Sequence, residues 1–260
     1  MKIKFLNSLL LEARLEVLSG LRTPSFVVPA VVFPILLYLF FGVFMVQGQL
    51  QDSVQASTYN LINYMVFGLM APALFNFGAN VAQERESGWL ELKLISPLPA
   101  SYYLFAKCLS ALTFTLLISV LLFSTAWMFG DVQLSWIVWV KLFALGVVGT
   151  IPFCFLGLVI GLKFSAKGAS AMTNLVFLPM AMLSGLWVPI FLMPEFMQQF
   201  AWILPSYHLS QLGLASVGLG QGHSTYFHLF VLSVISTILM MLAVVLYKSE
   251  GMSRRKRHRP

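Results

Sequence analysis

The chain has 260 residues, of which 59% are hydrophobic and only 10% charged, and its net charge is +7. Soluble domains carry a charge on about a quarter of their residues, so this composition excludes an ordinary water-soluble fold. The cations mostly separate apolar blocks, whereas a nucleic-acid-binding surface needs them clustered on a folded face. We therefore expect an all-α membrane protein that does not bind nucleic acid.

Residues 1–24 are predicted to form an amphipathic helix in the cytoplasmic membrane interface. Its apolar positions recur at helical spacing: Ile3, Leu6, Leu10, Ala13, Val17 and Leu21. Charged residues such as Glu12 and Arg14 interrupt any apolar core, so this stretch is not a signal peptide. We expect it to be retained and to lead into the first membrane span.

Six stretches are apolar over about the 20 residues that a helix needs to cross the hydrocarbon core. They lie near 25–46, 58–80, 104–129, 137–162, 170–192 and 224–247. Prolines inside them are tolerated in lipid when neighbouring helices satisfy the freed carbonyl groups, so we expect several kinked spans. The predicted organisation is a six-span domain over 25–247 and a basic cytoplasmic tail over 248–260.

The distribution of cations predicts the orientation, because short cytoplasmic loops retain Lys and Arg. With the amino terminus inside, 15 of the 16 Lys and Arg residues fall on the cytoplasmic side. The predicted outer segments 47–57, 130–136 and 193–223 contain none. We expect a multi-pass inner-membrane protein with both termini in the cytoplasm and a basic tail that attracts anionic lipids.

Sequence motifs for catalysis are missing from this chain. It has no Gly-Lys dipeptide and hence no Walker A loop for ATP, and it lacks the GxSxG and HExxH patterns. Cys108 and Cys154 lie in apolar stretches without metal-ligand spacing and are interpreted as packing residues. The prediction is a protein that is not an enzyme and has neither a metal site nor a cofactor of its own.

The segment 83–99 is the most unusual part of the chain. It holds three of the nine carboxylates, namely Glu84, Glu86 and Glu91. Two interpretations stay open. The segment is either a solvated loop with an interfacial helix, or a short helix presented to a soluble partner, with these charges as contacts and Trp89, Leu90 and Leu94 as its apolar anchor.

At this segment the sequence resembles the ABC type-2 transporter permeases. Their loop after the second span carries Glu, any, Glu, any, Gly, Thr, any, Glu and then a Pro. The matching positions are Glu84, Glu86, Gly88, Glu91 and Pro97, with Trp89 in place of the usual Thr. Near the outer end of the fifth span, Leu183, Ser184, Gly185 and Pro189 match a second family pattern. Residues 193–221 resemble the family's short outer helices.

The resemblance implies two six-span subunits that form a pathway and two copies of a separate ATPase that binds ATP and Mg²⁺. A homodimer of the permease is favoured and a heterodimer is possible. Residues 83–99, including Arg85, resemble the coupling helix that docks into the ATPase, and residues 1–24 resemble the connecting helix. The near absence of charge in the spans favours export of a hydrophobic or amphiphilic compound, such as a drug, a lipid or a glycan-type substrate.

Candidate pathway residues lie on the second and fifth spans, which face the dimer axis in such permeases. They are Asn63, Phe67, Asn76, Asn174, Ser184 and Gly185. The structural alternative stays open, because buried Asn also bonds helix to helix and small residues permit close packing. For Asn76, the residue Asn80 lies four positions on and shares its face. His208 is either a hydrogen-bonded structural residue or a sensor of external pH.

Two other classes of function compete with the exporter. An ion-driven secondary transporter would be expected to carry carboxylates within its spans, and no run of Asp, Glu or His occurs there. A membrane enzyme or an assembly scaffold is the third class. Catalysis by His208 or Cys154 would need a base or an orienting partner within hydrogen-bond reach, and none is close in sequence.

Overall fold

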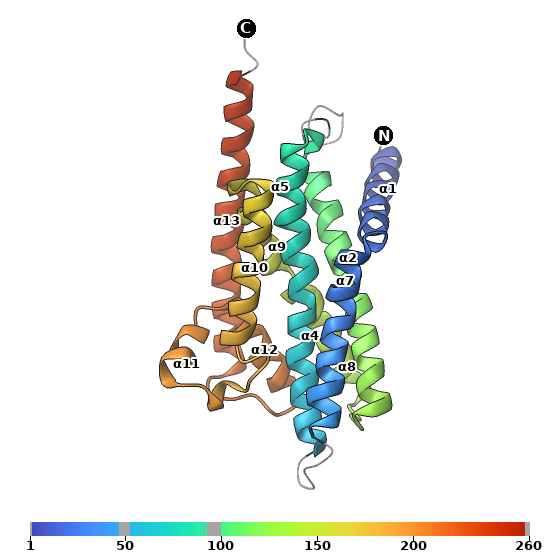
Figure 1. Ribbon diagram of the computed structural model, residues 1–260, viewed down its shortest axis with the longest axis vertical. Helices are drawn as coiled ribbons and strands as arrows, with labels where there is room; N and C mark the ends of the chain where they lie inside the picture. The colour runs from blue at the N-terminus through green and yellow to red at the C-terminus, as the bar shows by residue number, and fades with distance from the viewer. Residues whose placement is uncertain (1, 47–52, 91, 93–99, 258–260) are drawn as a thin grey trace.

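The computed structural model describes residues 2–46, 53–90, 92 and 100–257. All regular structure in these residues is helical. The long helices run roughly alongside one another, and the two chain termini lie at the same end of the molecule, which we call the terminal end (Figure 1). The opposite end, where α4 begins, is the far end. The expected all-α class is therefore confirmed.

The first helical stretch contains one sharp break and then a run rich in proline. Helix α1 (Lys2–Leu21) is interrupted at residues 22–23. The chain then continues as α2 (Pro24–Val27), η1 (Val28–Val32), α3 (Phe33–Leu37) and η2 (Tyr38–Phe44). Pro29 and Pro34 lack the N–H that an α-helical bond requires. The backbone is accordingly π-helical in η1 and η2, and the N–H of Met45 donates to the carbonyl of Phe40, five residues earlier.

The second span lies at the centre of the molecule. It consists of α4 (Ser53–Phe77) and α5 (Ala79–Glu86), joined at Gly78. Of its most apolar window, 83% is buried inside the protein. Helix α4 packs most extensively against α7 (Ala100–Phe129) and α9 (Ile151–Lys163).

The remaining helices complete the bundle, with the short helices α11 (Glu195–Ala201) and α12 (Pro205–Ser216) near the far end (Figure 1). In chain order they are α8 (Trp136–Gly149), α9, α10 (Ala166–Leu183), η3 (Ile190–Leu192), α11, α12 and α13 (Thr225–Arg257). Helix α13 contacts mainly α9 and α12. Only 11% of its apolar window is buried, so it lies at the edge of the bundle.

Close approach of α9 to the end of α4 depends on glycine. A Cβ atom on Gly157 would lie 2.8 Å from the carbonyl oxygen of Leu74, and Gly161 meets the backbone at Phe77 and Gly78. These two glycines are four residues apart, which is the small-residue spacing of tightly packed membrane helices.

Within the described residues, four helices are long and apolar enough to cross a membrane: Ser53–Glu86, Tyr102–Phe129, Trp136–Lys163 and Thr225–Tyr247. They match the second, third, fourth and sixth predicted spans. The first predicted span appears as a shorter apolar helix, Val28–Phe44. These helices, with an outer surface rich in large apolar side chains, form a multi-pass membrane protein, while the count of six spans stays a prediction.

The fifth predicted span, 170–192, needs a correction. Helix α10 ends at Leu183, and the chain then turns away from the helix axis. Gly185 adopts a φ of 78°. This left-handed backbone conformation commonly ends helices, and residues with a Cβ atom rarely adopt it. Residues 184–189 are therefore a turn, because the Ser184–Gly185 pair and Pro189 stop the helix despite the apolar composition.

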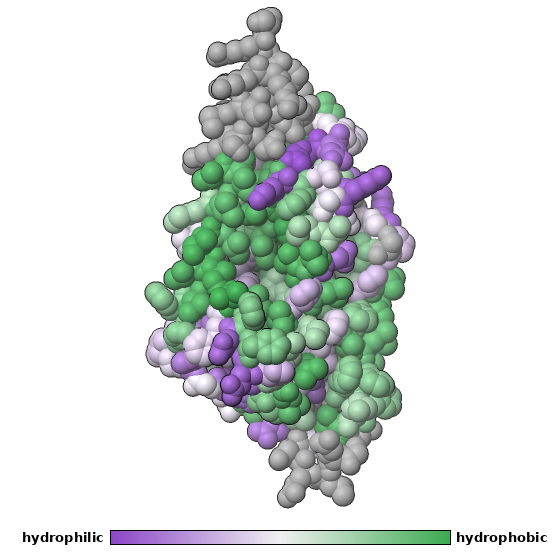
Figure 2. All heavy atoms as spheres, turned by 60° about the vertical axis from the view of Figure 1, so that its left-hand side comes forward, coloured by the Kyte–Doolittle hydropathy of each residue, from purple (hydrophilic) through white to green (hydrophobic). Residues whose placement is uncertain are grey.

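Many large apolar side chains are exposed on the molecular surface. Figure 2 shows, on the face in view, a broad hydrophobic area over the middle of the molecule, with hydrophilic residues gathered nearer both ends; we call this area the apolar belt. Large apolar side chains exposed on the surface include Leu175, Phe230 and Val245. A water-soluble protein rarely exposes so large a continuous apolar surface, so the belt is the face that meets lipid.

Candidate functional site

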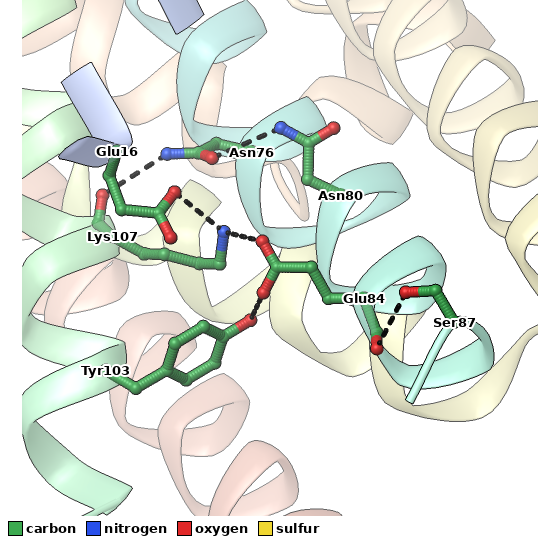
Figure 3. Close-up of polar contacts among 7 residues, drawn as sticks. All are labelled: Glu16, Asn76, Asn80, Glu84, Ser87, Tyr103 and Lys107. Carbon is green, nitrogen blue, oxygen red and sulfur yellow. Dashed lines mark hydrogen bonds and ion pairs between the residues drawn. The ribbon is translucent and has the colours of Figure 1, made fainter. Parts of the chain in front are cut away.

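A buried lysine joins three helices near the terminal end. The ammonium nitrogen of Lys107, on α7, lies 3.0 Å from Glu16 Oε2 on α1 and 2.8 Å from Glu84 Oε1 on α5 (Figure 3). The side chain of Lys107 is fully buried, whereas those of Glu16 and Glu84 are 12% and 22% exposed. One cation thus holds two acidic residues that are 68 positions apart in the sequence, from Glu16 to Glu84.

Further hydrogen bonds extend this contact into α4 (Figure 3). The hydroxyl of Tyr103 donates to Glu84 Oε2 over 2.6 Å, and the Tyr103 ring centroid lies 5.2 Å from the Lys107 ammonium nitrogen. Asn76 donates to the backbone oxygen of Lys107 over 3.4 Å. We call Glu16, Asn76, Glu84, Tyr103 and Lys107 the Lys107 cluster. It ties α1, α4, α5 and α7 together.

Because Lys107 is buried, its charge must be paired and hydrogen-bonded. Removing a charge from water costs several kcal/mol per ion, and this cost is offset only when the ion is paired and hydrogen-bonded. Lys107 meets both conditions through Glu16 and Glu84. A displacement of α1 or α5 alone would separate Lys107 from one of its carboxylates. The ion pairs therefore favour movement of α1 and α5 together with α7.

Arg85, one of the predicted coupling residues, also makes contacts within this chain. Its guanidinium donates to the carbonyl oxygen of Leu162 and, over 2.6 Å, to that of Phe164. These carbonyls lie at the carboxyl end of α9, where a helix leaves acceptors without intrahelical donors. Arg85 therefore caps α9 and fastens α5 to it, and these two contacts point into the protein.

Two of the candidate coupling residues, Glu86 and Trp89, have exposed side chains. Glu86 is exposed and Trp89 is 61% exposed, and between them Gly88 adopts a φ of 80°. We call Glu86 and Trp89 the exposed tip. Leu90 is buried in the core of this chain, so it does not belong to an outward apolar anchor. Glu91, Leu94 and Pro97 lie outside the described residues.

An apolar cavity of about 320 Å³ lies between the first helical run, α4 and α10. Five phenylalanines line it, namely Phe26, Phe33, Phe67, Phe75 and Phe177. The ring centroids of Phe67 and Phe177 are 5.0 Å apart, and Asn174 adds an amide to the wall. Two predicted pathway residues, Phe67 and Asn174, are thus brought together here.

The other predicted pathway residues lie elsewhere. Asn76 belongs to the Lys107 cluster and also accepts a hydrogen bond from Asn80 over 3.3 Å, which is the helix-bonding alternative. Asn63 accepts from the hydroxyl of Ser210 on α12, over 2.5 Å. The hydroxyls of Ser184 and Ser206 are also 2.5 Å apart. Gly185 forms the turn after α10 and does not line the cavity.

The sequence analysis missed Glu16, Tyr103 and Lys107 as site residues, because it used Lys107 only as an orientation signal. A usable signal was present. Lys107 falls inside the predicted span 104–129, and a cation within a span needs an acidic or carbonyl partner. Only a few carboxylates lie at the same end, but the sequence does not tell which of them reach the lysine.

The apolar outer surface and the bundle of long apolar helices define a multi-pass membrane protein. The chain belongs to the ABC-2 type transporter family, whose sequence pattern matches residues 9–218. It is also similar to a protein of Bacillus subtilis (strain 168) named "Putative transport permease YvfS". The two are 28% identical over 239 residues, which cover 92% of this chain and 96% of that protein. The chain is therefore a membrane permease subunit, and its family implies an ABC transporter with an ATPase partner.

Proposed function

We propose that this permease forms the export pathway of an ATP-driven transporter, as one of two permease subunits. Two copies of a separate ATPase subunit bind ATP and Mg²⁺ and dock on the exposed tip. The observation that carries the proposal is the Lys107 cluster, because it joins the base of the tip to α1 and to the central span. A homodimer of the permease is the favoured assembly, and a heterodimer is the alternative.

The terminal end is the cytoplasmic side in this proposal. Arg85, Lys163 and Lys167 lie at the helix ends on that side, while the far-end segments 130–136 and 193–223 have no Lys or Arg. Cytoplasmic loops of bacterial membrane proteins are enriched in these residues. Glu86 and Trp89 are then presented to the cytoplasm, where the ATPase is located.

Docking at the exposed tip would transmit movement of the ATPase to the membrane helices. Helix α5 continues α4 through Gly78, and Arg85 and Glu84 fasten α5 to α9, α7 and α1. A push on the tip therefore moves a fastened group of helices, not one loose loop. Rigid-body movement of packed helices is a common way in which transporters and allosteric proteins switch state.

The phenylalanine-lined cavity is the proposed contact point for substrate. Phe67 places the central span in its wall, so movement of α4 changes its shape. Its lining is apolar except for polar groups such as Asn174, a pattern suited to a hydrophobic or amphiphilic compound that one amide helps to orient. A polyanion would need cations along its path, and none lines this cavity among the described residues.

Capture of the ATPase tests the docking proposal. The double variant Glu86→Lys and Trp89→Ala reverses the charge and removes the aromatic anchor without touching the Lys107 cluster. Its affinity for the ATPase subunit is expected to fall at least tenfold, which is typical when an interface hot spot is removed. Binding is measured by co-purification and by stimulation of ATP hydrolysis in lipid nanodiscs.

The matched control is Glu195→Lys, which reverses an exposed carboxylate at the far end. This variant is expected to bind the ATPase as the unchanged protein does. Equal capture by the tip variant and the control would refute docking at the tip. Substrate efflux driven by an ion gradient without ATP would instead support the secondary-transporter alternative.

A further inference from the structure

Two buried histidines face each other at the far end. The Nδ1 atoms of His208, on α12, and His228, on α13, are 2.9 Å apart. The other ring nitrogen of His208, Nε2, lies 2.8 Å from the backbone oxygen of Trp202. The two residues are 1% and 2% exposed. His228 was not a candidate in the sequence analysis, whereas His208 was left open between a structural role and a pH sensor.

These contacts determine which nitrogens carry protons in the neutral pair. A backbone carbonyl only accepts, so His208 Nε2 carries the hydrogen and donates it to Trp202. His208 Nδ1 is then an acceptor, and the hydrogen on the 2.9 Å contact belongs to His228 Nδ1. His228 Nε2 then carries no hydrogen, and this buried atom makes no hydrogen bond to the described residues. The backbone of His223 lies nearby and would accept a hydrogen bond from His228 once that ring is protonated.

The surroundings contain titratable groups but no acid. The exposed His223 has its ring centroid 6.4 Å from that of His228, and Tyr207 has its own 5.8 Å from the same ring. Within the described part of the chain, no carboxylate contacts either buried imidazole. Burial lowers the pKa of His208, its bond to the Trp202 carbonyl acts in the opposite direction, and His223 lowers it further.

Besides its contact with α13, helix α12 bonds to α4 and to the end of α10, the two spans predicted to line the pathway. Ser210 donates to Asn63 on α4, and Ser206 shares a hydrogen bond with Ser184 at the end of α10. The side chain of Leu209 fills the space above Gly149 on α8. Helix α12 therefore lies between the far ends of these spans on one side and α13 on the other.

We propose that His208 and His228 form a proton-operated latch that fastens α12 to α13 when both rings are neutral and releases it when the exterior is acidic. The location of the latch on the outer side rests on the orientation given under the proposed function. A protonated imidazole is a donor at both nitrogens. Two protonated rings would thus face each other donor to donor, with like charges and no neighbouring carboxylate.

The direction of the pH effect follows from linkage. In the closed form the buried pair stays neutral, whereas rings released to water titrate near their ordinary value of about 6.5. Below that pH the open form binds more protons than the closed form, so acid favours opening. For each proton bound only by the open form, the ratio of open to closed molecules rises about tenfold per pH unit.

Hydrogen exchange on the full-length permease in nanodiscs tests the latch without substrate or ATPase. Amide protection of residues 205–216 is compared at about pH 8 and about pH 5, on either side of the ordinary histidine pKa, after correction for intrinsic exchange rates. Wild type is expected to lose at least tenfold of this protection in acid. Helix α9, which contains no histidine, serves as the internal reference.

Substitution distinguishes the latch from general acid sensitivity. His228→Gln keeps a hydrogen-bonding side chain that does not titrate, so protection of 205–216 is expected to become independent of pH. His223→Gln, at the exposed histidine, is the matched control and is expected to keep the wild-type response. A wild-type protein whose corrected protection does not change, or a His228→Gln variant that responds as wild type does, would overturn the latch. Failure of the wild-type permease to capture any ATPase subunit would refute only the export proposal.

Discussion

Lys107 is the residue on which the terminal end depends most. In Lys107→Met the two carboxylates that it pairs would lose their common cation, although both retain some solvent contact. Breaking a buried ion pair from one side costs about 3 kcal/mol. We expect a marked fall in the unfolding temperature in detergent, whereas Lys107→Arg retains most of the stability because the charge remains.

The control for this prediction is Lys141→Met, which removes an exposed lysine from α8. Its unfolding temperature is expected to change little, since exposed charges contribute at most about 1 kcal/mol. The combined variant Glu16→Gln, Lys107→Met and Glu84→Gln should recover part of the loss, because no charge is left buried. Equal stability of Lys107→Met and Lys141→Met would contradict the assigned role of the cluster.

Residue types were easier to predict than their partners. The family motif located Glu84 and Glu86 correctly in one segment, but it treated them alike, and the structure separates them. Glu84 turns inward to Lys107 and Tyr103, while Glu86 is exposed. That difference depends on the positions of α1 and α7, which come from distant parts of the sequence, so local pattern alone could not supply it.

Packing of α9 against α4 depends on the absence of a side chain at Gly157. In Gly157→Ala the new Cβ would press on the carbonyl of Leu74, and a backbone atom cannot move aside as a flexible side chain can. We expect a destabilisation of about 1–3 kcal/mol, typical of overpacking. Reversible unfolding in mixed micelles measures it.

Gly146→Ala is the matched control on a neighbouring helix. The nearest atoms to its new Cβ would be 3.7 Å away, an ordinary contact distance. The substitution is expected to be neutral or to stabilise α8 by up to about 1 kcal/mol, because alanine is the better helix former. Destabilisation of both variants to the same extent would argue against a specific α4–α9 contact.

Helix existence was well predicted, and helix ends were not. Long apolar blocks such as 104–129 appear as continuous helices, since composition and length suffice to identify them. The prediction for 170–192 was wrong beyond Leu183, because hydropathy does not register the left-handed Gly185. The π-helical segments Val28–Val32 and Tyr38–Phe44 likewise arise from backbone hydrogen bonding, which an apolar composition does not reveal.

Orientation in the membrane is a property of the whole molecule and is testable by labelling. With Cys108 and Cys154 replaced by alanine, single cysteines are introduced as Gln221→Cys at the far end and Glu86→Cys at the terminal end. Both sites are exposed. In intact cells, a membrane-impermeant maleimide is expected to label position 221 but not 86.

Permeabilised cells provide the control for that labelling, because both cysteines should then react. Labelling of position 86 in intact cells would place the terminal end outside and would refute both the cytoplasmic docking of the ATPase and the outer location of the histidine latch. The same experiment therefore bears on the two proposals at once, while hydrogen exchange bears on the latch alone.

The contrast between the central span and α13 has a consequence for biogenesis. Helix α13 exposes nearly all of its apolar window and can enter the bilayer by itself, whereas the central span is largely enclosed and carries buried Ser57, Asn63 and Asn76. Such polar groups are costly in lipid until neighbouring helices bond them. The central span is synthesised early, but the helices that pack against it include α7, α9 and α12, which are synthesised later. Its final placement must therefore wait for them, so a truncated chain lacking α12 would be a natural target for membrane quality-control proteases.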